Sequence, residues 1–202
     1  MSGRAGGGGP AGLAALEARV AAALAAGQLE VAATEAIRGL GPQILGYLSR
    51  VLGSPDDAAD AFSLFSERLW RGLAGFEGRC TLRVWAYRVA WTAALGVAGD
   101  GWRRRRERLH TSMASRVAAE VLTRSPQAVE QAAAGIEALR AGLTAEERSL
   151  LVLRVDQRLA WREVAEVMRG EGVMLDEAAL RKRFERVKEK LGALARGAGL
   201  LG

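Results

Sequence analysis

Residues 177–191 read EAALRKRFERVKEKL, and this stretch carries the most distinctive pattern in the chain. Leu180, Phe184, Val187 and Leu191 recur at intervals of four, three and four residues, which predicts one apolar face of an α-helix. The other faces carry six Lys or Arg side chains. A helix that is buried along one side and cationic elsewhere is suited to lie along a polyanion. A solvated helix with charge pairs between neighbouring turns shows the same pattern.

The segment that precedes this helix predicts how it is held. Thr144 and Glu147 have the spacing of a capping box, which opens a helix rich in aliphatic residues. A second short amphipathic segment, WREVAEVM at 161–168, is followed by a glycine-containing connection and by Asp176, a good N-cap for the basic helix. Helix, short helix, turn and basic helix is the order of a helix-turn-helix, whose last helix enters the major groove of DNA. Three helices also form bundles that bind no DNA.

Two further helices are predicted in the N-terminal half. Ser54 as N-cap and Pro55 at the first helical position open a helix that continues to Trp70, with two acids in its first turn. Residues 82–92, LRVWAYRVAWT, form a second helix that mixes aromatic rings with arginine, and a run of four arginines follows at 103–106. Aromatic and guanidinium planes are the groups that hold unstacked bases. The same rings could instead fill a core.

Both halves resemble parts of one family. The pattern at 143–184 resembles the C-terminal domain of bacterial RNA polymerase sigma factors, although the connection at 169–173 is longer than is usual there. The N-terminal pattern is similar to the promoter-melting domain of small, two-domain sigma factors of the extracytoplasmic-function type. Ser63 and Leu64 depart from it, since the family usually has Gln-Glu there. The residues that match in register are Asp57, Ala58, Asp60, Arg68, Leu69, Trp70, Trp85, Tyr87, Arg88 and Ala90.

The resemblance implies two kinds of contact surface. The residues implied to bind core RNA polymerase are Asp57, Asp60, Phe62, Arg68 and Trp70. Those implied to capture the minus-ten element are Trp85, Arg88, Trp91, Thr92, Arg103, Arg104, Arg105 and Arg106. Those implied to contact the minus-thirty-five element are Arg181, Lys182, Arg183, Arg186 and Lys188.

Composition agrees with a nucleic-acid partner and disfavours other classes of protein. The 202 residues carry a formal charge of +6, with an isoelectric point near 10.4, which favours a polyanionic partner. The one cysteine, Cys80, excludes an internal disulfide and fits a reducing cytoplasm. With one histidine, His110, and no Cys/His cluster, we expect no metal, no cofactor and no enzymatic activity. No apolar run reaches the length of a membrane span.

These observations predict an all-α fold of two small helical domains joined by a linker, the second a helix-turn-helix. The predicted segments are a disordered tail at 1–12, a promoter-melting and polymerase-binding domain at 13–110, a linker at 111–134, the helix-turn-helix domain at 135–196 and a tail at 197–202.

The function implied is that of a cytoplasmic transcription initiation factor. Its partners would be core RNA polymerase and promoter DNA, with an anti-sigma protein as a further candidate. Two alternatives stay open: a helix-turn-helix regulator that acts without polymerase, and a sigma-like decoy that binds an anti-sigma protein.

Overall fold

The computed structural model describes residues 10–98, 113–124, 142–169 and 176–197, and every regular element in these ranges is helical. The elements are α1 (Pro10–Ala25), α2 (Leu29–Leu52), α3 (Pro55–Gly72), the short 3-10 turn η1 (Leu73–Gly75), α4 (Leu82–Ala98), α5 (Met113–Arg124), α8 (Ala145–Leu151), the π-helical turn η3 (Val152–Asp156), α9 (Trp161–Met168) and α10 (Glu177–Gly197). The predicted all-α fold is therefore confirmed for the described part of the chain. None of the described helices is long and apolar enough to cross a membrane.

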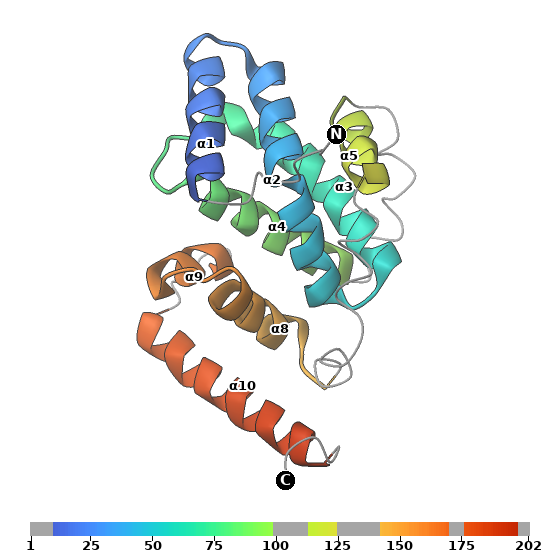
Figure 1. Ribbon diagram of the computed structural model, residues 1–202, viewed down its shortest axis with the longest axis vertical. Coiled ribbons are helices and arrows are strands. Elements are labelled where there is room, and N and C mark those ends of the chain that lie inside the picture. The colour runs from blue at the N-terminus through green and yellow to red at the C-terminus, as the bar shows by residue number, and fades with distance from the viewer. Residues whose placement is uncertain (1–9, 99–112, 125–141, 170–175, 198–202) are drawn as a thin grey trace, which may run out of the picture.

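Helix α2 is the centre of the N-terminal bundle, because α1, α3, α4 and α5 all pack against it (Figure 1). Small residues on its first turns, including Ala32, Ala33 and Ala36, are almost completely buried and let the neighbouring helices approach closely. Its later turns bury larger side chains, namely Ile37, Leu40, Ile44, Leu45, Tyr47 and Leu48. Burial of this apolar surface is the main force that holds the bundle together.

The helix starts predicted from the sequence are present in the structure. The Ser54 Oγ accepts a hydrogen bond from the Asp57 backbone N–H at 3.3 Å, with Pro55 at the first helical position of α3. Thr144 and Glu147 form the reciprocal capping box, through hydrogen bonds of 3.2 and 2.8 Å. At α10, the Asp176 Oδ1 accepts from the Ala178 N–H at 3.3 Å. Local side-chain chemistry therefore fixes where these three helices begin.

The ends of the N-terminal unit differ from the prediction. Helix α1 already begins at Pro10, inside the segment predicted as a disordered tail. Helix α5 lies inside the predicted linker, yet it packs on α2 and α3 through Ala114, Val117, Ala118 and Val121, which are all buried. The Arg38 Nη2 of α2 also contacts the Glu120 Oε2 of α5 at 2.7 Å. Because its apolar stripe is buried on the bundle, α5 is part of the N-terminal unit.

The C-terminal unit, made of α8, η3, α9 and α10, packs directly on the N-terminal bundle (Figure 1). Helix α8 lies against α2, and α9 lies against α4. Leu150, Leu153, Val164 and Val167 of the C-terminal unit belong to the same buried cluster as the residues of the bundle. The two predicted domains therefore share one continuous apolar core. The order of elements is that of a helix-turn-helix, but the connection at 170–175 lies outside the described residues, so the motif stays a prediction.

The packing of α8 on α2 can be tested at Gly53. Gly53 ends α2 with a φ of 70°, and a Cβ added there would lie 2.7 Å from the Arg148 Nη1 of α8. Gly27 has the same φ, but nothing lies within 4 Å of its added Cβ. Both Gly→Ala changes should cost about 1–2 kcal/mol for the left-handed backbone. Gly53→Ala should cost about 1 kcal/mol more, because Arg148 must move. Chemical denaturation of both variants measures the difference, and equal losses would contradict the contact between α8 and α2.

Candidate polymerase and nucleic-acid interface

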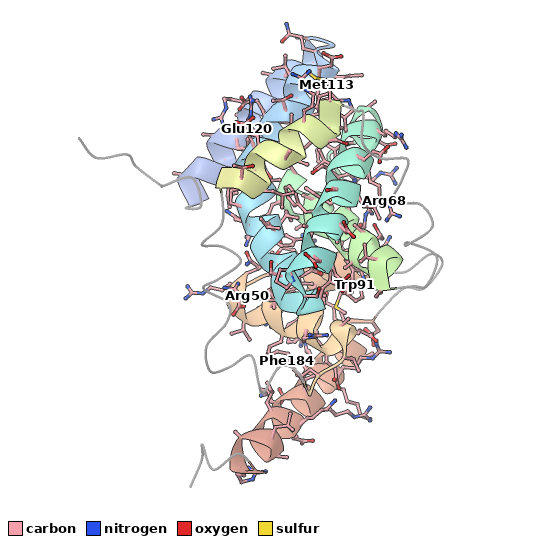
Figure 2. The ribbon with its side chains drawn as sticks, turned by 90° about the vertical axis from the view of Figure 1, so that its right-hand side faces the viewer. Arg50, Arg68, Trp91, Met113, Glu120 and Phe184 are labelled. Carbon is pink, nitrogen blue, oxygen red and sulfur yellow. The ribbon has the colours of Figure 1, made fainter. Side chains whose placement is uncertain are left out.

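The outward face of α3 carries most of the residues predicted to bind polymerase. Asp57 and Arg68 are exposed, and Asp60 and Trp70 are half-buried. Figure 2 shows Arg68 on the outer side of the bundle. Arg71 is exposed as well, and it forms an ion pair with the largely buried Glu67 one turn earlier. This face is therefore a mixed-charge surface that begins with two acids at the positive end of the helix dipole.

Phe62 does not belong to that surface. Its side chain is fully buried, and its ring lies 5.6 Å from the ring of Phe65 at an angle of 35°. A side chain without exposed area cannot touch a partner. Phe62 therefore anchors α3 in the bundle, and the prediction that it binds polymerase directly is corrected.

The tryptophans of α4 are also buried. Trp85 is 8% exposed and packs beside Phe76 with ring centroids 5.2 Å apart, and Trp91 is only 4% exposed. A ring must present a face to solvent before it can stack on a base. In this arrangement both rings fill the core, which is the alternative that the sequence left open. The Thr92 hydroxyl donates to the Val89 carbonyl at 2.9 Å, so it stabilises its own helix.

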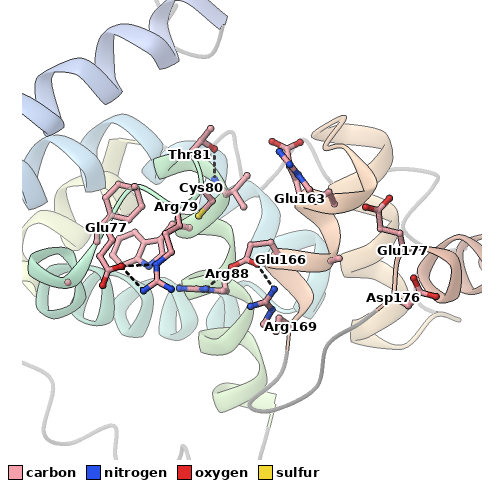
Figure 3. Close-up of a pocket in the computed structure, with 17 residues that line it drawn as sticks. Glu77, Arg79, Cys80, Thr81, Arg88, Glu163, Glu166, Arg169, Asp176 and Glu177 are labelled. Atoms are coloured by element: carbon pink, nitrogen blue, oxygen red, sulfur yellow. Dashed lines mark hydrogen bonds and ion pairs between the residues drawn. The ribbon is translucent and has the colours of Figure 1, made fainter.

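Arg88 and Thr92 are the predicted DNA-contacting residues of α4 that are part-exposed, and Arg88 is the charged one. Its Nη1 lies 2.8 Å from the Glu166 Oε1 of α9, and Glu166 also contacts Arg169 at 3.0 Å (Figure 3). About a third of the Arg88 side chain remains exposed. The structure therefore pairs Arg88 with a carboxylate from the C-terminal unit. Arg103, Arg104, Arg105 and Arg106 lie outside the described residues.

Two buried tyrosines connect α2 with α4 and with the C-terminal unit. Tyr47 and Tyr87 pack edge to face with ring centroids 5.2 Å apart. The Tyr47 Oη is hydrogen-bonded to the Ser149 Oγ of α8 at 2.7 Å. Burial raises the pKa of Tyr87 to about 12, although the guanidinium of Arg83 opposes this shift, and burial raises the pKa of Tyr47 as well. Both phenols stay neutral at physiological pH and serve as buried structural groups.

Arg50 and Arg83 also reach from the bundle to the C-terminal unit, and neither was predicted as a site residue. The Arg50 Nη1 lies 3.4 Å from the Asp156 Oδ2. The Arg83 Nη2 donates to the Gln157 carbonyl at 2.9 Å and to its side-chain oxygen at 3.1 Å. These partners are more than seventy residues apart in sequence. Because helical periodicity reports only on neighbouring turns, no local signal could have paired them.

The basic helix α10 has the apolar face that the sequence predicts. Leu180 and Val187 are buried, and the ring of Phe184 packs edge to face on Trp161 of α9 at 5.5 Å. Two charge pairs reach α8: Lys190 Nζ lies 2.8 Å from the Glu147 Oε2, and Arg183 contacts Glu146. These contacts seat α10 on α8 and α9.

The outward side of α10 keeps its cationic character. The predicted DNA-contacting residues there are all exposed, namely Arg181, Lys182, Arg183, Arg186 and Lys188. Arg181 pairs with Glu177, and Lys188 pairs with Glu185, within the same helix. Exposed pairs of this kind contribute little to stability and exchange readily for phosphate. The cationic face of α10 is therefore accessible to a polyanion.

A cleft of about 1130 Å³ separates the start of α4 from α9 and the start of α10 (Figure 3). Arginines and acids alternate along its walls, including Arg79, Arg162 and Glu163. Cys80 also lines it, and partial burial raises the pKa of this thiol. Among the described residues, no group of His, Cys, Asp and Glu could hold a metal ion. The cleft marks the boundary between the two units.

One known protein family matches part of the N-terminal unit. Residues 36–108 match Sigma-70 region 2. The matched range begins within α2, contains all of α3 and α4 and therefore includes both the acidic start of α3 and Arg88. The match supports a sigma-factor family for this unit. No curated protein matches the chain.

Proposed function

We propose that this chain is a sigma factor of the two-domain, extracytoplasmic-function type, which binds core RNA polymerase and directs it to specific promoters. The observation that carries the proposal is the match of residues 36–108 to Sigma-70 region 2 on a helical bundle of the expected order. The basic, apolar-backed helix α10, which follows in the position of a minus-thirty-five reader, adds independent support. The role is one of binding rather than catalysis, and the proposed location is the cytoplasm.

The polymerase would dock on the outward face of α3. The first turn of α3 presents acids at the end of the helix where the dipole stabilises negative charge. Arg68 lies on the same face, nearer the C-terminal end of the helix. A basic surface on the polymerase is the complementary partner. Ser63 and Leu64, which are half-buried at the middle of this face, replace the polar pair usual in the family and would make that part of the contact less polar.

This docking surface predicts a charge-reversal effect. Asp57→Lys should weaken the affinity for core RNA polymerase by about tenfold, because an acid at the proposed contact becomes a base. The thermal midpoint should change little, because an exposed first-turn acid contributes only about 0.3–1 kcal/mol to folding. The matched control is Glu30→Lys, which reverses an exposed first-turn acid of α2 outside the Sigma-70 region 2 match. Equal binding by both variants in a pull-down with purified core enzyme would remove Asp57 from the interface.

Promoter DNA would meet two surfaces. Arg88 on α4, together with the arginine run at 103–106, would hold the melted minus-ten strand. The exposed cations of α10 would lie on the phosphates of the minus-thirty-five duplex, where some of them could also read base edges.

The α10 surface predicts a salt-dependent loss of binding. Lys182→Ala and Arg186→Ala should each weaken binding to duplex DNA and lower the salt slope by about one unit, because one phosphate contact is removed. Glu189→Ala, at another exposed position on the same helix, is the control and should not lower the slope. Fluorescence anisotropy across a salt series measures the slopes, and wild-type slopes in both variants would exclude α10 as the duplex contact.

The proposed function and its two alternatives differ in the partners that the chain should bind. A helix-turn-helix regulator would bind duplex DNA but not core polymerase. A decoy for an anti-sigma protein would bind neither DNA nor polymerase productively. Co-purification with core polymerase therefore distinguishes the proposed function from both alternatives.

A further inference from the structure

The exposed cations of α10 differ in what they contact within the protein. Arg183 pairs with Glu146 and therefore helps to seat α10 on α8. Lys182 and Arg186 are exposed and form no ion pair with another described residue. Arg181 is a third case, because it is exposed but contacts two other side chains. This difference separates Arg181 from the cations that can move freely toward a phosphate.

Arg181 is held at two points. Its Nη2 lies 3.3 Å from the Glu177 Oε2, one turn earlier on α10. Its guanidinium carbon lies 5.8 Å from the centroid of the Trp161 ring of α9, which is within the range of a cation–π contact. The Arg181 side chain is still 59% exposed. A guanidinium carries five N–H donors, and Glu177 engages only one of its nitrogens, so donors remain for a ligand.

The ring of Trp161 is itself fixed by its neighbours. Arg154 of η3 lies over this ring at 5.0 Å, and the Arg154 Nη1 donates to the Leu159 carbonyl at 2.8 Å. The ring of Phe184 packs on it edge to face, at 75°. Trp161 is only half-buried, whereas the residues that α9 buries lie further along the helix, from Val164 onward. The indole therefore presents an oriented surface at the edge of the contact between α9 and α10 (Figure 1).

The place of Arg181 on α10 indicates what it would contact. It lies in the second turn of the helix, and the first turns of the last helix of a helix-turn-helix contact base edges in the major groove. The commonest specific contact of this kind is an arginine that donates to both O6 and N7 of a guanine. A side chain that is already ordered loses less conformational freedom on binding, which favours such a two-point contact. Phosphate contacts position a protein on DNA and do not read its sequence, so they need no such ordering.

We propose that Trp161 is a positioning residue for sequence recognition: its ring and Glu177 hold Arg181 so that the guanidinium reads a guanine in duplex DNA. Arg181 touches the base, and Trp161 acts through Arg181. Lys182 and Arg186 supply the contacts to phosphates. This inference rests on the proposed function, because it assigns a base-reading role to one side chain of the duplex-binding surface of α10.

The test measures base preference with the full chain and without polymerase. The probe is a pool of duplex oligonucleotides with a randomised central block, and the duplexes that the chain captures are sequenced. The variants are Arg181→Lys, which keeps the charge but loses the planar fork of donors, and Trp161→Leu, which removes the ring. Trp161→Tyr keeps an aromatic face and is the conservative variant. Lys182→Ala is the control, because it removes an exposed cation that the ring does not hold.

The wild type should prefer a guanine at one position of the captured duplexes by about tenfold. Arg181→Lys and Trp161→Leu should both abolish that preference, at the same position, and Trp161→Leu should keep the salt slope of the wild type because its phosphate contacts remain. Trp161→Tyr should keep most of the preference. Lys182→Ala should bind more weakly with a lower salt slope, yet it should still prefer the guanine.

A second series keeps the packing constant and decides the matter if Trp161→Leu does not fold. Tryptophans that carry increasing numbers of fluorine atoms replace Trp161, which weakens the negative face of the ring with little change in its shape. The preference for guanine should fall along the series while the thermal midpoint stays unchanged. An unchanged preference would overturn the positioning role, as would the loss of preference at different positions in Trp161→Leu and Arg181→Lys. A wild-type chain that selects no sequence would overturn it too. Failure of the proposed function would show in polymerase binding instead, which these measurements do not use.

Discussion

Trp91→Ala should lower the stability of the protein by about 3–5 kcal/mol, which is the usual cost of removing a buried aromatic side chain. Trp91 is only 4% exposed and belongs to the main apolar cluster, so its removal leaves a cavity that the surrounding helices can fill only in part. The thermal midpoint should fall by on the order of 10 °C, since each kcal/mol shifts the midpoint of a domain of this size by roughly 2–4 °C.

The matched variant is Trp91→Phe, which keeps an aromatic ring but removes less volume. It should lose less than half as much stability, because most of the buried contact area remains. A ring used only for stacking on bases would give the opposite pattern: both variants would keep the wild-type midpoint in differential scanning calorimetry, and both would be slower to open a promoter. Wild-type stability in Trp91→Ala would therefore return this residue to the DNA-contacting surface.

Leu180→Ala should have an effect of similar size on the C-terminal unit, about 2–5 kcal/mol. Leu180 is completely buried in the main cluster, and it lies on the first turn of the helix whose outer face is proposed to bind duplex DNA. On warming, Leu180→Ala should lose its affinity for duplex DNA at a clearly lower temperature than the wild type does, although no cation has been removed. This would separate the role of the apolar face from that of the charges.

Leu191→Ala is the control, because Leu191 lies on the same apolar face of α10 but is only half-buried. It should lose clearly less stability than Leu180→Ala. Urea denaturation followed by circular dichroism measures both variants. Equal small losses would mean that the start of α10 does not pack as described.

The sequence predicted those parts of the fold that depend on neighbouring residues. The caps at Ser54, Thr144 and Asp176 need only side chains within three residues, and all are present. The apolar face of α10 follows from helical periodicity, and Leu180 and Val187 on that face are buried. The all-α fold follows from the same periodicity repeated along the chain.

The candidate site depended on contacts that local patterns do not encode. Arg88 was predicted from its place among aromatic residues, but its pairing with Glu166 depends on how α9 sits on α4. The same packing decides whether Trp85 and Trp91 face solvent or the core, since an aromatic ring on an amphipathic helix suits both. Helix α5 was assigned to the linker, and only its packing on α2 and α3 shows what covers its apolar stripe.

The most direct test of the central claim is whether the full chain forms a complex with a bacterial core RNA polymerase. Purified core enzyme and a molar excess of the chain are mixed and separated by size-exclusion chromatography, with Asp57→Lys run in parallel. A sigma factor should co-elute with the core enzyme at one copy per polymerase, and Asp57→Lys should co-elute at a lower level. A chain that elutes entirely apart from the core enzyme, while it still binds duplex DNA, would contradict the account and favour a regulator that acts without polymerase.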